Sequence, residues 1–180
     1  MFYISEIMNT KPTVFITELQ NLVYTTLEKL EIPFERVNTD EAISMDDCIL
    51  INQKMNMKMV KTLFLCNRQQ TDFYLFITTA HKSLKSKEFS KVLNISRVSF
   101  APAELLQEKL GTKVGAATIL SVLFDVKNEI QVVIDKEVIL EDFYGCSDGT
   151  TTGYMKISTE LIINNFLNYA MHKPIIIEIQ

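Results

Sequence analysis

The spacing of hydrophobic residues changes along the chain, from a helical period to short apolar runs. Over residues 14–30 the apolar side chains recur every three or four positions, which predicts an amphipathic helix. Pro33 ends that pattern, and residues 34–37 alternate as in a short strand. Two dense apolar runs, 62–66 and 73–77, are joined by a polar segment and together predict a β-hairpin.

The rest of the chain is predicted to mix single helices with short strands. Proline favours the first turn of a helix and glycine the position after its last turn, which predicts a helix from Pro102 to Leu110 that Gly111 ends. Residues 118–124 and 130–134 are predicted to pair as strands. The other predicted elements are a helix that begins after Ser44 as its N-cap, a helix over 83–93, strands over 97–100 and 137–140, a loop over 145–153, a strand over 154–157, a helix N-capped by Ser158, and a strand over 175–179.

This order of hairpins and single helices lacks the regular strand–helix alternation of a doubly wound sheet. We therefore predict the α+β class, with a mixed, curled central sheet flanked by helices. The 180 residues suit one domain, predicted over residues 1–180, because domains typically hold roughly 100–200 residues.

Composition narrows the range of functions. No run approaches the roughly 20 consecutive apolar residues of a membrane span, and residues 1–6 lack the features of a signal peptide. We therefore expect a cytoplasmic protein with no membrane partner. The net charge of −4 argues against a broad phosphate-binding surface, and hence against DNA, but leaves contact with the end of an RNA open.

Cysteine and histidine usage argues against metal and nucleophile chemistry. Cys48, Cys66 and Cys146 are odd in number and far apart, and His81 and His172 show no metal-ligand spacing. The chain also lacks a GxGxxG, P-loop, HExxH or GxSxG motif. We expect no metal and no cofactor, and a structural Cys146 is favoured over a nucleophile pair with His172.

Lys61 is the strongest candidate for chemistry because it stands at the entry of the apolar run 62–66. A lysine held there by the core is aimed at a fixed point, where it can meet an anionic ligand. The alternative is a lysine that only blunts a sheet edge, and position alone favours that alternative. A second basic stretch is either a solvated helix face or a phosphate contact. It consists of Lys82, Lys85, Lys87 and Lys91 beside His81.

The hairpin carries a resemblance to a known family. Its strands read Lys61-Thr62-Leu63-Phe64-Leu65 and Tyr74-Leu75, and they resemble the prolyl-tRNA editing domain family. That family comprises freestanding aminoacyl-tRNA deacylases related to the editing insertion of bacterial prolyl-tRNA synthetases. The resemblance covers roughly residues 20–180. Its other matching segments are 32–37, 98–101, 110–115 and 132–135.

The resemblance implies hydrolysis in trans of a mischarged aminoacyl-tRNA, typically Ala-tRNA(Pro) or one bearing another small amino acid. Because the ester is already activated, such an enzyme needs only to place water, stabilise the oxyanion and hold the terminal adenosine. Lys61 matches the family's essential lysine and is assigned to the terminal phosphate or ribose. The resemblance also implies substrate contacts from Ser44, Gly115, Ala116, Asp135, Ser147, Asp148 and Thr152.

Two family motifs are altered here. The Gly-x-x-x-Pro loop runs from Gly115 to Ile119 and lacks its proline, and Ser147-Asp148 replaces a His-Pro pair. An aspartate there adds a charge that could hold an α-amino group or repel phosphate. The alternatives left open are a catalytically silent protein that binds a tRNA end or small ligand, and an interaction module without a ligand. The apolar residues 175–177 could serve a homodimer interface or the core, and the core is favoured.

Overall fold

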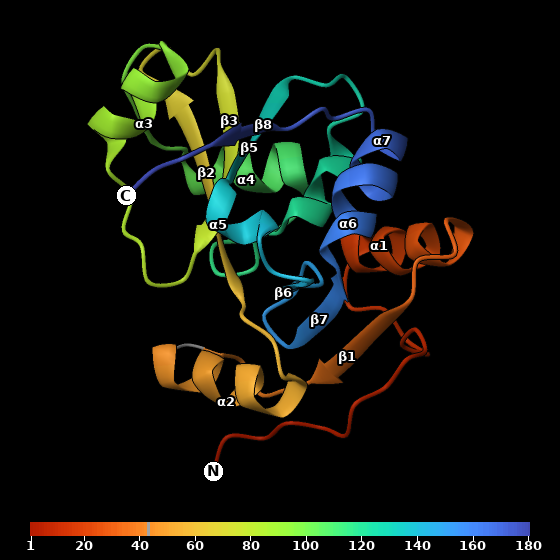
Figure 1. The fold of residues 1–180 in the computed structure, drawn as a ribbon. Helices are drawn as coiled ribbons and strands as arrows, with labels where there is room; N and C mark the ends of the chain where they lie inside the picture. Colours follow the sequence, from red (N-terminus) through yellow and green to blue (C-terminus); the bar gives the residue numbers. More distant parts are fainter. Residues whose placement is uncertain (43) are drawn as a thin grey trace.

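The computed structural model describes residues 1–42 and 44–180 and contains two β-sheets with helices packed around them (Figure 1). One sheet is antiparallel, in the order β1-β7-β6, and the other is mixed, in the order β4-β2-β3-β5-β8. The predicted α+β class is therefore confirmed. The strands are β1 (Phe34–Asn38), β2 (Val60–Asn67), β3 (Phe73–Thr79), β4 (Val98–Phe100), β5 (Ile130–Asp135), β6 (Phe143–Ser147), β7 (Gly153–Ser158) and β8 (Ile175–Ile177).

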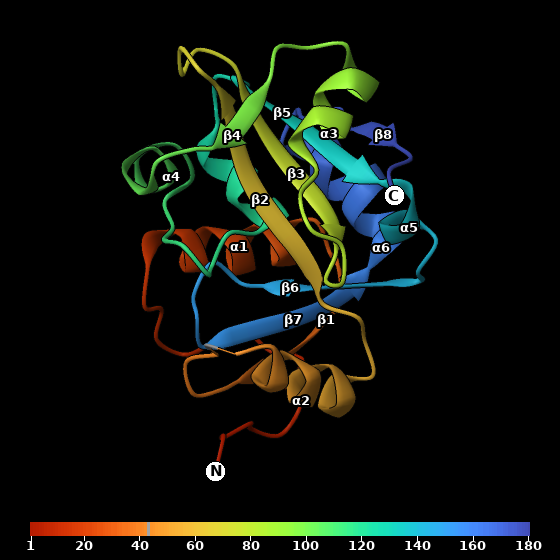
Figure 2. The same cartoon turned by 90° about the vertical axis from the view of Figure 1, so that its left-hand side faces the viewer.

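Helices surround both sheets. In the view of Figure 2, α2 lies below the three-stranded sheet and α3 lies beside the upper part of the five-stranded sheet. Among the described residues, no helix is both long and apolar enough to cross a bilayer. The helical elements are α1 (Glu18–Lys29), α2 (Met45–Met55), α3 (Ser86–Leu93), α4 (Ala103–Leu110), the 3₁₀ helix η1 (Ile119–Phe124), α5 (Lys136–Ile139), α6 (Thr159–Leu161), the π-helical η2 (Ile162–Phe166) and α7 (Leu167–Tyr169).

The two sheets meet where β2 begins. A parallel bridge joins Met59, just before β2, to Gly145 in β6. A Cβ at Gly145 would lie 2.8 Å from Met57 Sδ and 3.0 Å from the Lys58 carbonyl oxygen, so the close approach of these segments requires glycine there. This junction fixes the relative position of the two sheets beside the cavity described below.

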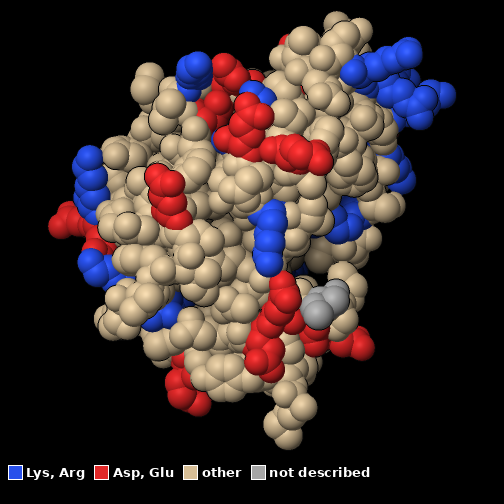
Figure 3. Space-filling model, turned by 180° about the vertical axis from the view of Figure 1, so that it is seen from behind, with Lys and Arg blue, Asp and Glu red and all other residues tan. Residues whose placement is uncertain are grey.

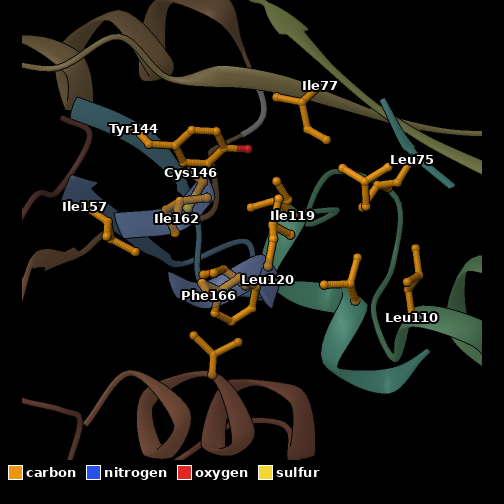
Figure 4. Close-up of a cluster of buried hydrophobic side chains, with 14 of the residues drawn as sticks. Leu75, Ile77, Leu110, Ile119, Leu120, Tyr144, Cys146, Ile157, Ile162 and Phe166 are labelled. Atoms are coloured by element: carbon orange, nitrogen blue, oxygen red, sulfur yellow. The ribbon is translucent and has the colours of Figure 1, made fainter. Parts of the chain in front are cut away.

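The main hydrophobic core fills the space between the sheets (Figure 4). Leu75 and Ile77 of β3 point into it, and Tyr144 of β6 and Phe166 of η2 enter from the other side. Phe76 points to the opposite face of β3, as alternation along a strand requires, and packs in a second cluster beneath α3. The five-stranded sheet is therefore covered on both faces.

Several local predictions are confirmed. The predicted hairpin is β2–β3, which pair antiparallel. Ser44 and Ser158 are N-caps whose hydroxyls accept backbone hydrogen bonds, and Gly111 ends α4 in the left-handed conformation with φ +66°.

Three predictions were wrong. Residues 119–124 form the 3₁₀ helix η1 instead of a strand, because a fully buried apolar run has no period that separates helix from strand. As a result β5 pairs in parallel with β3 and β8. Residues 136–139 form α5, whose first turn is capped by Asp135, and the predicted loop 145–153 lies partly in β6 and β7.

Candidate active site

A cavity of about 310 Å³ lies where the start of β2, helix α2, the end of β6 and the loop before η1 meet. Three of the residues predicted from the sequence line it together, namely Lys61, Gly115 and Ser147. Most of the wall is apolar, and among the described residues no aspartate or glutamate lines it. A pocket with an apolar wall and a few polar groups is typical of small-molecule sites.

Lys61 is held in the wall of this cavity by its strand. It pairs with Thr78 of β3 at the end of the hairpin away from the turn, as predicted. Its Nζ donates a hydrogen bond to the backbone carbonyl of Lys82. An ammonium group has three N–H donors, so this bond fixes the side chain and leaves two donors for an anionic or hydroxyl ligand.

The loop at Gly115 is a tight turn that presents backbone to the cavity. The Ala116 N–H closes the turn by donating to the Lys113 carbonyl oxygen at 3.0 Å, and Gly115 has φ +91°, which favours glycine. The N–H groups of Gly115 and Ala117 donate to no acceptor within residues 1–42 and 44–180. They are therefore candidate donors to a substrate oxygen. Ala116, which was predicted to contact the substrate, is fully buried and does not line the cavity, whereas its neighbour Ala117 does.

The Ser147 hydroxyl is engaged within its own loop. Its Oγ donates to the Thr150 carbonyl oxygen at 2.6 Å and accepts from the Gly149 N–H at 3.0 Å. The residue lines the cavity, but its oxygen stabilises the turn between β6 and β7. The side chain is therefore poorly placed to replace a histidine as acid or base.

Asp148 faces the interior of the protein. It is only 1% exposed, and its Oδ2 accepts hydrogen bonds from Gln20 Nε2 at 2.9 Å and from the Tyr24 hydroxyl at 2.8 Å. Burial, and then the charge of Asp148, raise the pKa of Tyr24. The carboxylate anchors α1 to the β6–β7 loop. This placement supports neither the predicted contact with an α-amino group nor the predicted repulsion of a phosphate.

Three further predicted residues lie outside the lining of the cavity. Asp135 is fully buried and accepts hydrogen bonds from Thr78 Oγ1 at 2.7 Å and Lys82 Nζ at 2.9 Å. Ser44 Oγ accepts from the Asp47 N–H as the cap of α2, whose next residues line the cavity. The Thr152 carbonyl oxygen accepts a hydrogen bond from the Thr39 N–H at 2.9 Å, and the residue lines a separate hollow.

The contribution of α2 to the cavity was not predicted from the sequence. Cys48 and Asn52 are one helical turn apart and both line the cavity. Asn52 also accepts a hydrogen bond from the Met59 N–H at 2.9 Å, which ties α2 to the start of β2. The one sequence signal was this i, i+4 spacing, which does not reveal what the helix faces.

No cysteine–histidine nucleophile is formed. Cys146 lines the cavity, but burial raises the pKa of its thiol to about 12 even though a hydrogen bond with Thr118 lowers it. The two ring nitrogens of His172 lie 2.7 Å from Asp125 Oδ2 and 2.6 Å from the Ala170 carbonyl oxygen. Within the part of the chain that the structure describes, no three metal-ligating side chains come together.

Comparison with known proteins agrees with this geometry. The family model for the aminoacyl-tRNA editing domain matches residues 46–164, more than half of the chain. The prolyl-tRNA editing protein ProX of Acetoanaerobium sticklandii is 25% identical over 122 residues, which cover 68% of this chain and 74% of ProX.

Two solved structures show the same fold. A candidate trans-editing enzyme for prolyl-tRNA synthetase superposes with a TM-score of 0.62 at 12% identity, over 92% of this chain and all of the other. A hypothetical protein superposes with a TM-score of 0.63 at 13% identity, over 85% of this chain and 96% of the other. Fold, cavity and family match lead to one conclusion. The chain belongs to the aminoacyl-tRNA editing domain family.

Proposed function

We propose that this chain acts as one editing domain over residues 1–180 and hydrolyses mischarged aminoacyl-tRNA in trans, in the cytoplasm. The proposal rests on the family and, above all, on the position of Lys61. This cation lines the same apolar cavity as Gly115 and Ala117, whose backbone N–H groups have no acceptor among the described residues. That arrangement suits an ester whose leaving group is a ribose hydroxyl beside a phosphate.

The reaction adds water to the ester carbonyl and breaks the bond to the ribose oxygen, which gives a free amino acid and tRNA. Lys61 binds the terminal phosphate or ribose, and the N–H groups of Gly115 and Ala117 stabilise the developing oxyanion. Since the Ser147 hydroxyl and the Cys146 thiol are both unsuited to act as base, the proton of water passes through the substrate's neighbouring hydroxyl or solvent to the ribose oxygen that leaves. The rate enhancement then comes mainly from holding the ester and the attacking water in a reactive geometry.

The wall of the cavity favours a small, uncharged amino acid. The methyl groups of Ala42, Ala80 and Ala117 line it, and the described lining holds no carboxylate for a cationic side chain. Alanine is therefore the proposed substrate side chain. Size selection by such a pocket is weak, since one methylene is worth only about 1–3 kcal/mol.

A second candidate function is a catalytically silent protein that binds the end of a tRNA. The observation that favours it is the Ser147 hydroxyl, which is occupied within its loop and replaces the family's histidine. Saturable tRNA binding without ester loss would support this candidate.

The test is a panel of tRNA(Pro) charged with alanine, cysteine, serine or proline, with ester loss followed over time. The proposed function predicts selective loss of the alanyl ester and survival of the prolyl ester. Stability of every ester in the presence of folded protein would contradict hydrolysis and favour the silent binding protein.

A further inference from the structure

Four exposed cations gather at the N-cap of α3, on the helix and in the segment after it. They are Lys85, Lys87, Lys91 and Arg97, which we call the α3 basic surface. None of them forms an ion pair with a described acidic side chain, whereas seven other lysines do. The acid within residues 83–97 is Glu88, which accepts a hydrogen bond from the Gln180 N–H. This segment therefore carries a net charge of +3 in a chain whose net charge is −4.

Helix α3 sets the spacing of two of these cations. Lys87 and Lys91 are one turn apart on the same face. The opposite face is buried through Phe89, whose ring lies 4.8 Å from that of Phe76 in β3. Figure 3 shows Lys and Arg side chains gathered at the upper right corner of the molecule, over α3, apart from the main groups of acidic side chains.

The α3 basic surface begins close to the rim of the cavity. Ala80 lines the cavity, and the Lys82 carbonyl accepts the hydrogen bond from Lys61. Lys85 is five residues beyond Ala80, hence at most about 18 Å away. Helix α3 then extends roughly 12 Å farther. The cations thus form a path that leads away from the candidate active site.

The rim of the cavity on the α2 side carries acidic side chains. The first turn of α2 carries Asp46 and Asp47, and Glu41, which pairs with Lys113 at 3.4 Å, lies just before it. Phosphate groups that leave the cavity are repelled on that side and attracted on the α3 side. The charge distribution therefore favours an exit on the α3 side.

We propose that the α3 basic surface binds the phosphate backbone of the tRNA acceptor end while the aminoacylated terminus occupies the cavity. The identity of the RNA rests on the proposed function. Contacts of this kind supply affinity and orientation, not base recognition, and they weaken as salt is raised. Lys82, which belongs to the same basic stretch of sequence, is excluded because its ammonium is buried against Asp135.

The experiment measures the affinity of uncharged tRNA(Pro) for the full chain over a range of salt concentrations. The test variant is Lys87→Gln with Lys91→Gln. The control is Lys127→Gln with Lys173→Gln, which removes the same charge at two other exposed lysines. Loss of two phosphate contacts lowers the slope of log affinity against log salt by roughly 1.4–1.8. The test variant is expected to show this change, and the control is expected to keep the wild-type slope.

An unchanged slope in the test variant, or an equal change in the control, would overturn the proposal. Binding of vesicles that contain phosphatidylserine is measured alongside. If only vesicle binding depended on Lys87 and Lys91, the α3 basic surface would be a membrane contact, and the proposal that it binds tRNA would be wrong.

Ester hydrolysis is assayed separately, so the two proposals can fail independently. Hydrolysis by the wild type, with unchanged tRNA affinity in the test variant, would keep the proposed function and remove the α3 assignment. The absence of hydrolysis, with tRNA affinity that depends on Lys87 and Lys91, would keep the α3 assignment and remove the deacylase activity.

Discussion

The Nζ of Lys61 donates a hydrogen bond to the backbone carbonyl of Lys82, in the segment between β3 and α3. The ammonium of Lys82 lies in turn 2.9 Å from Asp135 Oδ2 and 2.6 Å from the Ile179 carbonyl oxygen. The candidate catalytic cation is therefore positioned by a segment that a buried ion pair fastens to β5 and to the C-terminal end of the chain.

The buried pair predicts a large effect of Lys82→Met on stability. Removal of the ammonium leaves the fully buried Asp135 carboxylate without its charge partner, which costs about 3–5 kcal/mol of unfolding free energy. The double variant Lys82→Met, Asp135→Asn is expected to recover part of this loss because no unpaired charge remains. Urea unfolding measures all three proteins.

Lys58 is the matched control for this prediction. Its 2.6 Å pair with Glu141 is exposed, so Lys58→Met is expected to cost less than about 1 kcal/mol. Equal stability of Lys82→Met and the wild type would show that the pair does not fasten the segment.

Gly153→Ala is predicted to destabilise the β6–β7 loop. An added Cβ would clash with Asp148 Oδ2, and this carboxylate cannot move without loss of its hydrogen bonds to Gln20 and Tyr24. Overpacking of this kind costs about 1–3 kcal/mol. The neighbouring Thr152→Ala is expected to stay within about 0.5 kcal/mol of the wild type. A similar midpoint of thermal unfolding for both variants would contradict the buried role of Asp148.

The three cysteines are predicted to differ in reactivity. At pH 8 an alkylating reagent should modify the half-buried Cys48 first, and Cys66 and Cys146 only after unfolding. Burial raises the pKa of Cys146 to about 12, so roughly one thiol in ten thousand is ionised at that pH. Mass spectrometry of the alkylated protein reads out each site. Rapid modification of native Cys146 would reveal a reactive thiol in the cavity and restore nucleophilic catalysis as an explanation.

The sequence predicts the parts of the fold that local signals determine. The hairpin of β2 and β3, the Ser44 cap with its reciprocal bond to Asp47, and the end of α4 at Gly111 all follow from residues near each other in the chain. Helix η1 could not be predicted in this way. Its apolar run is buried on every side, so no polar positions show whether the run repeats with the period of a helix or of a strand.

The candidate site is less predictable because its decisive contacts are distant in sequence. In the sequence Asp148 has the appearance of an unpaired charge in a loop, because its hydrogen-bond partner Gln20 is 128 positions away. Asp135 is similarly paired with Lys82, 53 positions away. Lys61 was found because a strand entry fixes a side chain locally, whereas the faces that α2 and the Gly115 loop present to it depend on how the two sheets pack.

The most direct test of the account compares single-turnover hydrolysis of Ala-tRNA(Pro) by the wild type, Lys61→Ala and Lys58→Ala, with circular dichroism to confirm that each is folded. Removal of one preorganised polar contact to the reacting group typically costs 10²–10³-fold in rate. If Lys61 is the catalytic cation, Lys61→Ala is expected to hydrolyse the ester at least about 100-fold more slowly than the wild type, and Lys58→Ala at a rate near the wild type. Hydrolysis by folded Lys61→Ala at the wild-type rate would contradict the assignment of Lys61 as the catalytic cation.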